Sequence, residues 1–161
     1  MIRFWSQVFT FIAVLVILCS VSSTPQAEPA VTIEKISESA LDELINARNN
    51  KIVVTFMAAW CGPCIDELPT LNKVYKKYRE HGLNLIGISI DLAGPRAMQP
   101  IIDKLQVRFP VYWYGEAAVQ KFSVFAIPMI FFVKDGQIVG KLPGRRSEKV
   151  LNKKIREFLE P

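Results

Sequence analysis

The feature that most constrains this chain is an apolar run that ends at a pair of cysteines. Residues 51–59 read KIVVTFMAA, a continuous β-branched and aromatic segment typical of a strand buried on both faces of a sheet. Cys61 and Cys64 follow, with Gly62 and Pro63 between them, and the residues beyond show helical periodicity. The sequence therefore predicts a strand, a turn and a helix, with both cysteines at the start of the helix.

Helices and strands alternate along the rest of the chain. Ser37 or Ser39 can cap a helix over 37–49, and Ser147 can cap a last helix. An Asp-Gly pair, Asp135-Gly136, lies between two apolar runs and predicts a β-hairpin. The other expected elements are a helix from Cys61 to His81-Gly82 kinked at Pro69, helices at 96–106 and 117–122, and strands at 83–90, 109–114, 129–133 and 138–142. This order indicates an α/β sandwich with a mixed sheet.

The N-terminus carries a separate apolar segment. Residues 4–21 contain no charged side chain, and as a helix of ~1.5 Å per residue they would span ~27 Å, close to the thickness of a bilayer's hydrocarbon core. We expect an export signal or an uncleaved signal-anchor over 1–23, a linker over 24–30 and one folded domain over 31–161. Cys19 follows Leu18, and we interpret it as an apolar residue of the membrane helix because bacterial lipoprotein signals place a small residue before their cysteine.

The chain has a formal net charge of +5. Its basic residues gather on two predicted helices, as Lys73, Lys76, Lys77 and Arg79 and as Lys149, Lys153, Lys154 and Arg156. Such a surface could attract anionic lipid or an acidic partner. Acidic residues are interspersed and no aromatic stacking pattern accompanies the charges, so we interpret these as solvated helix faces. Nucleic acid is not an expected partner.

Three kinds of chemistry compete for the cysteine pair. Structural zinc needs about four ligands, and beyond the pair the domain offers only His81, at the end of the same helix, so no metal site is predicted. A disulfide that closes so short a loop removes little chain entropy and stabilises weakly. Redox exchange remains, and it requires no cofactor beyond the two thiols.

The position of the pair suits redox exchange. Free backbone N–H groups and the helix dipole at the helix start lower the pKa of the Cys61 thiol, which predicts a nucleophile. Cys64 lies one turn later and deeper, which suits the resolving role. Pro63 loses no hydrogen bond in the first turn, and Gly62 lets a substrate backbone approach the sulfur. Trp60 beside Cys61 offers flat apolar contact to a partner.

These motifs resemble the thioredoxin superfamily. The sequence WCGPCIDELP at 60–69 is similar in particular to the TlpA/ResA-type membrane-anchored thiol-disulfide oxidoreductases, whose pattern WCxPCxxExPxL is matched through Leu71. The resemblance implies a thioredoxin-like three-layer sandwich with a central mixed sheet. It also implies that the Ile127-Pro128 bond is cis, lies against the cysteines and is flanked by backbone that pairs with the substrate chain.

The sequence departs from this family where the resolving cysteine needs a proton acceptor. Cytoplasmic thioredoxins bury an aspartate at the position of Thr55, which cannot accept a proton here. Asp91 is the nearest carboxylate of the next strand, expected either at the strand end facing solvent or as a relay. Glu67 is the other candidate, either a first-turn acid that complements the helix dipole or a proton relay. Lys141 and Arg145 are interpreted as surface residues.

The sequence therefore predicts an extracytoplasmic thiol-disulfide oxidoreductase that reduces disulfides in exported clients. The resemblance implies a membrane thiol donor of the DsbD/CcdA type, clients such as apocytochrome c, and a place in the periplasm or anchored in the inner membrane. A periplasmic oxidase or isomerase is the main alternative. A thiol peroxidase, whose PxxxTxxC signature is absent, and a non-catalytic assembly factor remain open as further alternatives.

Overall fold

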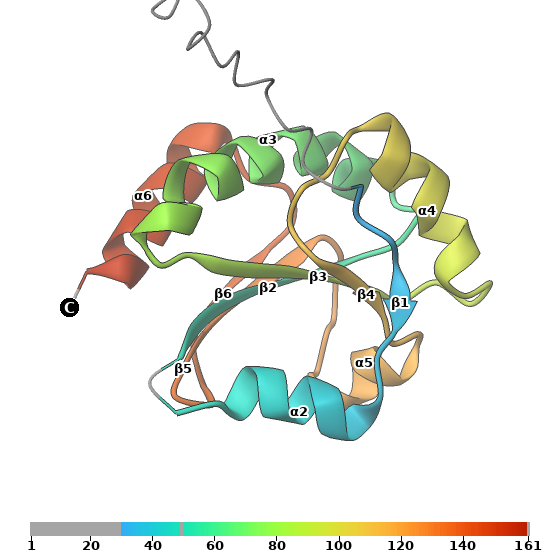
Figure 1. The fold of residues 1–161 in the computed structure, drawn as a ribbon, viewed down its shortest axis with the longest axis horizontal. Helices are drawn as coiled ribbons and strands as arrows, with labels where there is room; N and C mark the ends of the chain where they lie inside the picture. Colours follow the sequence, from blue (N-terminus) through green and yellow to red (C-terminus); the bar gives the residue numbers. More distant parts are fainter. Residues whose placement is uncertain (1–29, 49, 161) are drawn as a thin grey trace, which may run out of the picture.

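The computed structural model describes residues 30–48 and 50–160, which form one mixed sheet flanked by helices (Figure 1). The described strands are β1 (Glu34–Lys35), β2 (Lys51–Met57), β3 (Asn84–Ser89), β4 (Val111–Trp113), β5 (Met129–Lys134) and β6 (Gln137–Pro143). The described helices are α2 (Glu38–Asn46), α3 (Gly62–Tyr78), the 3₁₀ helix η1 (Arg79–His81), α4 (Pro95–Lys104), α5 (Ala117–Lys121) and α6 (Glu148–Leu159).

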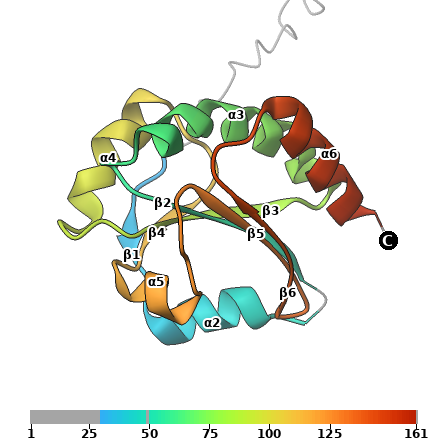
Figure 2. The ribbon, with the colours of Figure 1, turned by 180° about the vertical axis from the view of Figure 1, so that it is seen from behind.

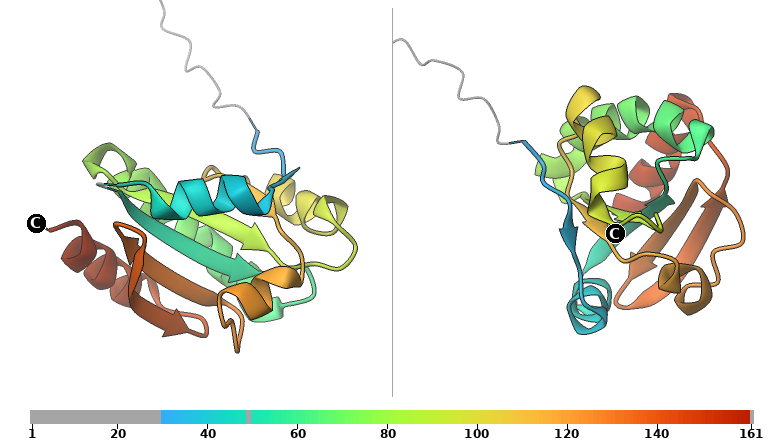
Figure 3. Two further views of the ribbon diagram at one scale, coloured as in Figure 1. Left: turned by 90° about the horizontal axis from the view of Figure 1, so that it is seen from below. Right: turned by 90° about the vertical axis from the view of Figure 1, so that its right-hand side faces the viewer.

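The elements are arranged in three layers. Helices α3, α4 and α6 cover one face of the sheet, and α2 and α5 cover the other (Figures 1 and 2). Seen from below, α2 lies in front of the strands (Figure 3). The predicted α/β sandwich with a mixed sheet is confirmed.

The sheet has the order β1-β4-β3-β2-β5-β6. Strand β2 is central, parallel to β3 and antiparallel to β5, and every residue from Ile52 to Met57 is buried. This confirms the strand predicted at 51–59, which ends two residues earlier than expected because the chain turns at Ala58 toward α3. The register pairs Phe56 with Met129, so the residue before β5, Pro128, lies at the same end of the sheet as the cysteines.

Local signals in the sequence account for most element ends. Ser37 caps α2 by accepting a hydrogen bond from the Ala40 N–H at 3.2 Å, and Ser147 caps α6 in the same way. The hairpin between β5 and β6 turns at Asp135 and Gly136, whose φ angles of 52° and 78° are those of a primed turn. Both caps and the hairpin follow the predictions, with Ser37 rather than Ser39 as the first cap.

Other elements also differ from the predictions, and α2 ends at Asn46, three residues before the predicted end at 49. Helix α3 ends at Tyr78, and the predicted end at His81-Gly82 is a 3₁₀ turn that closes at Gly82 with φ 86°. Strand β1 was not predicted because two residues carry no alternating pattern, and its pairing with β4 defines it. Helix α3 continues through Pro69, and the kink expected there stays a prediction.

The predicted signal or anchor segment at 1–23, with Cys19, lies outside the described residues, as does nearly all of the predicted linker at 24–30. Within residues 30–48 and 50–160, no helix is both long and apolar enough to cross a bilayer. The boundaries of the three predicted regions stay predictions.

Candidate active site

The end of β2 places Cys61 at the start of α3. Cys61 is the N-cap residue, with φ −94° and ψ 95°, and its Sγ accepts a hydrogen bond from the Cys64 N–H at 3.2 Å. Its carbonyl oxygen accepts hydrogen bonds from the N–H groups of Cys64 and Ile65 at 3.0 and 3.1 Å. The sulfur therefore lies where N–H groups lack partners within the helix and where the helix dipole favours an anion.

Cys61 and Cys64 form a disulfide, and their Cα atoms are 5.2 Å apart. The exposed fraction is 6% for Cys61 and 2% for Cys64, in agreement with the predicted deeper position of the second cysteine. Gly62 and Pro63 between them are exposed, and a Cβ added to Gly62 would meet nothing within 4 Å. The space beside Gly62 is thus open to an approaching chain.

Pro128 and Trp60 lie at the same end of the sheet. The Ile127-Pro128 peptide bond is cis, as predicted, with Pro128 buried and Ile127 half-buried. The Pro128 carbonyl accepts a hydrogen bond from the Gly144 N–H at 2.7 Å. Trp60 is 69% exposed, so its indole is available to a partner as predicted.

Glu67 lies one turn beyond Cys64 and is 0% exposed. Its Oε1 accepts a hydrogen bond from the Arg146 N–H at 2.6 Å, and its Oε2 is buried with no hydrogen-bond partner among the described residues. Burial raises the pKa of Glu67 above its ordinary value of 4.5, and the Arg146 N–H and the charges of Arg145 and Arg146 oppose that rise only in part. Glu67 lies beyond the first turn of α3, so the interpretation as a first-turn acid was wrong, and its role as a proton relay stays a prediction.

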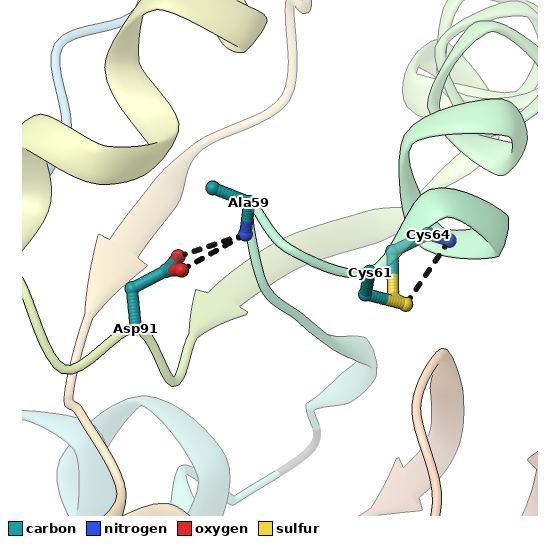
Figure 4. Close-up of a disulfide and its surroundings, with 4 residues drawn as sticks. All are labelled: Ala59, Cys61, Cys64 and Asp91. Atoms are coloured by element: carbon teal, nitrogen blue, oxygen red, sulfur yellow. Dashed lines mark hydrogen bonds between the residues drawn. A yellow bond between two sulfur atoms is a disulfide. The ribbon is translucent and has the colours of Figure 1, made fainter.

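Asp91 does not point to solvent, and that expectation was wrong. The residue is 2% exposed, and its two carboxylate oxygens accept the Ala59 N–H at 2.9 and 3.1 Å (Figure 4). Ser89 Oγ donates to the same carboxylate at 2.8 Å, and the Asp91 carbonyl accepts the Trp113 indole N–H at 2.6 Å. The turn after β2 passes over the end of β3 and presents an N–H that needs a buried acceptor, and Asp91 supplies it.

The remaining predicted residues lie where the sequence placed them. Thr55 is 1% exposed in the middle of β2, between Gly87 and Ile130, and it carries no group that accepts a proton at neutral pH. Lys141 and Arg145 are exposed. His81 is exposed beyond the far end of the 17-residue helix α3, about 25 Å from Cys61 at ~1.5 Å per residue. Among the described residues, no cluster of three or more potential metal ligands is present.

The sequence analysis did not identify Arg146 or the partners of Asp91. Ser89 and Asp91 are two residues apart at a strand end, a short-range pattern that could have indicated a shared hydrogen bond. Arg146 offered no comparable signal, because its contact with Glu67 joins residues 79 positions apart.

The chain is similar to known proteins of one family and to thiol-disulfide oxidoreductases within the curated relatives. A model of the AhpC/TSA family matches residues 26–141. The thiol-disulfide oxidoreductase ResA of Bacillus cereus is 30% identical over 111 residues, which cover 68% of this chain and 64% of the relative. The chain thus spans slightly less than two thirds of that relative's length.

Solved structures place the fold among thioredoxin-like proteins. StoA from Bacillus subtilis has a TM-score of 0.62 at 20% identity, over 72% of this chain and 87% of that one. An uncharacterized thioredoxin-like protein from Porphyromonas gingivalis has a TM-score of 0.63 at 29% identity, over 81% of this chain and 90% of that one. The three-layer sandwich described above is therefore a thioredoxin-like fold.

Proposed function

Because the chain belongs to the AhpC/TSA family, we propose that it is a thiol-disulfide oxidoreductase of the TlpA/ResA type. The observation that carries the proposal is the cysteine pair at the start of α3, where Cys61 Sγ accepts the Cys64 N–H at 3.2 Å. A thiolate is the attacking form in disulfide exchange, and this environment stabilises it.

The first step uses the reduced pair. The Cys61 thiolate attacks one sulfur of a client disulfide, which forms a Cys61–client bond and breaks the client S–S bond. The second client sulfur leaves as a thiolate and takes up a proton. Open space above Gly62 and the 69% exposed indole of Trp60 support an approach of the client from this side.

The second step resolves the mixed disulfide. The Cys64 thiol gives its proton to the Glu67 carboxylate, and the resulting thiolate attacks Cys61 Sγ. The Cys61–Cys64 bond forms, the Cys61–client bond breaks, and the second client thiolate takes up a proton that Glu67 releases. Two electrons have then passed to the client, and the protein is left with the disulfide seen in the structure.

Client binding in this proposal uses the segment before β5. The Pro128 carbonyl already accepts the Gly144 N–H, and Pro128 has no N–H to donate. Pairing with an extended client therefore falls on the backbone just before it, at Ile127. Such pairing places the client cysteine beside Cys61, since β2 and β5 are neighbours at this end of the sheet.

We propose that the exchange is reductive and takes place outside the cytoplasm. The Gly62-Pro63 dipeptide resembles that of reducing thioredoxins, and residues 4–21 have the length and composition of a membrane anchor. Continued turnover then needs electrons from a membrane thiol donor of the DsbD/CcdA type. Exported proteins with disulfides, such as apocytochrome c, are the corresponding clients.

Trapping of clients tests the proposal. The Cys64→Ser variant should accumulate mixed disulfides through Cys61, whereas the Cys61→Ser variant should accumulate none, as judged by non-reducing electrophoresis and mass spectrometry. Equal trapping by both variants, or trapping by neither, would contradict these roles.

The direction of electron flow is tested by the reduction potential of the pair together with its redox state in cells. A potential near that of reducing thioredoxins, about −270 mV, is expected, whereas about −120 mV would indicate an oxidase. Steady consumption of peroxide without a client would indicate a peroxidase, and activity that survives loss of both cysteines would indicate an assembly factor.

A further inference from the structure

The segment between β6 and α6, residues 144–147, contacts both parts of the active site. On one side, the Gly144 N–H donates to the Pro128 carbonyl at 2.7 Å. On the other, the Arg146 N–H donates to Glu67 Oε1 at 2.6 Å. Gly144 has φ 74°, a conformation that glycine adopts without strain and that lets the chain turn between the two contacts.

The side chains of this segment surround Glu67 with positive charge. Arg145 forms an ion pair with Asp66 at 3.6 Å, and both side chains are largely exposed. The Arg146 Nη2 donates to the Pro143 carbonyl, which fixes the guanidinium within its own turn. Arg146 Nε is buried and, among the described residues, has no hydrogen-bond partner. Glu67 Oε2 and Arg146 Nε are therefore both buried without a hydrogen-bond partner among the described residues, although the Arg146 main-chain N–H is bonded to Glu67 Oε1.

The unpartnered oxygen of Glu67 calls for an explanation. Buried polar atoms in native proteins almost always find partners, and a catalytic role is one reason for an exception. Here the main-chain bond holds Oε1 in place, and Oε2 is left available to take up and release a proton. The guanidinium charges favour the ionised form, which is the form that accepts a proton.

We propose that residues 144–146 are a positioning element of the redox site: they hold the Glu67 carboxyl in place and supply the positive charge that keeps it able to accept the Cys64 proton, while they also bind the Pro128 carbonyl. The inference rests on the proposed function, because it names what tunes the proton acceptor of that site. No residue of this segment touches the reacting sulfurs in the proposal.

The other charged groups near Glu67 are paired with each other. Asp66 on α3 is paired with Arg145, and Glu148 at the start of α6 is paired with Lys73 of α3 at 3.4 Å. The Arg146 guanidinium forms no ion pair among those found in the described residues, and its charge acts on Glu67 without a direct contact that pairs the two side chains. Removal of the two arginine charges should leave Glu67 a weaker acid.

The test reads Glu67 directly, by carbon NMR of its side-chain carboxyl across a pH titration of the full chain. The Arg145→Gln/Arg146→Gln variant should move the Glu67 midpoint upward by about one pH unit, a tenfold change in proton affinity. The single variant Arg146→Lys keeps both positive charges, so its Glu67 midpoint should lie close to that of the wild type. Lys141→Gln, which removes an exposed charge on β6, is the matched control and should leave the midpoint in place.

The same variants are then compared in the rate of mixed-disulfide resolution as a function of pH. The pH–rate profile should contain one inflection that Glu67→Gln removes. In the arginine variants this inflection should move upward with the Glu67 midpoint. In a Glu67→Gln background the arginine substitutions should leave the resolution rate unchanged. An unmoved midpoint, an equal shift in Lys141→Gln, or a rate effect that persists without Glu67 would each overturn the inference. Absence of client trapping by Cys64→Ser would instead contradict the proposed function, and the carboxyl titration does not depend on that result.

Discussion

Two buried carboxylates, Glu67 in α3 one turn beyond Cys64 and Asp91 beside the turn before Cys61, have opposite hydrogen-bonding environments. Asp91 receives the Ala59 N–H on both oxygens and the Ser89 hydroxyl on one of them. Glu67 receives one N–H, on Oε1, and its Oε2 has no partner among the described residues. The exposed fractions of the two residues, 0% and 2%, do not distinguish them.

The difference lies in hydrogen bonding and indicates a division of labour. A carboxylate whose oxygens are all engaged by fixed donors stabilises the local structure through those hydrogen bonds. A carboxylate with one engaged and one free oxygen can exchange a proton without the loss of its anchoring bond. We therefore assign the fixing of the active-site turn to Asp91 and the exchange of protons to Glu67.

The largest expected effect is on catalysis through Glu67. Glu67→Gln keeps the size of the side chain and an acceptor for the Arg146 N–H, but it cannot take the Cys64 proton. The rate of mixed-disulfide resolution should fall by about 10²-fold at neutral pH, the lower end of general acid–base contributions. Rapid-quench measurement of client release gives this rate. The matched control is Glu80→Gln, which neutralises an exposed acid in η1 and should leave the rate nearly unchanged.

A large effect on stability is expected at Asp91. Asp91→Ala leaves the Ala59 N–H and the Ser89 hydroxyl without their acceptor, and the free energy of unfolding should fall by about 2 kcal/mol. Urea denaturation of the oxidised protein measures this loss. If Glu67→Gln destabilises the protein as much as Asp91→Ala does, the assigned division of labour is wrong.

The pH dependence of stability should report on the burial of Glu67. Because the folded protein raises the pKa of Glu67 above its ordinary value of 4.5, the folded state binds that proton more tightly than the unfolded state. The associated stabilisation is present below pH 4.5 and is lost as the pH rises through the folded pKa. The slope of this loss cannot exceed about 1.4 kcal/mol per pH unit, the value for one proton.

Urea denaturation of the wild type and Glu67→Gln at a series of pH values isolates this contribution. As the pH rises above 4.5, the unfolding free energy of the wild type should fall relative to that of Glu67→Gln, since the amide carries no charge to bury. A difference that is constant across pH would show that Glu67 has the same proton affinity in the folded and unfolded chains.

The sequence was sufficient to predict the strand and the helix that position the two cysteines. The apolar run before Cys61 predicted a buried strand, and the residues after it predicted the helix that places Cys61 at an N-cap. These are local patterns, in which burial and hydrogen bonding depend on residues a few positions apart. The cis bond before Pro128 was reached only through the family resemblance.

The environment of the two carboxylates could not be predicted in the same way. Asp91 was expected either at a solvent-facing strand end or as a relay, and the donor that it binds, the Ala59 N–H, is 32 positions away. Glu67 was named as a candidate, but its burial depends on Arg146, 79 positions away. The first contact follows from how the end of β3 packs against the turn before Cys61, and the second from how the segment before α6 packs against α3. No periodicity in the sequence indicates either contact.

The smallest expected effect is at Ser89, and it sharpens the assignment of Asp91. Ser89→Ala removes one donor to the carboxylate and leaves the Ala59 N–H bonded, so unfolding free energy should fall by only about 1 kcal/mol. In the Asp91→Ala background the same substitution should cost less, because the hydroxyl has already lost its acceptor. Urea denaturation of the two single variants and the double variant completes this cycle. Strictly additive losses would mean that the bond from the Ser89 hydroxyl to the Asp91 carboxylate adds nothing, and that the fixed state of Asp91 rests on the main-chain bond to Ala59.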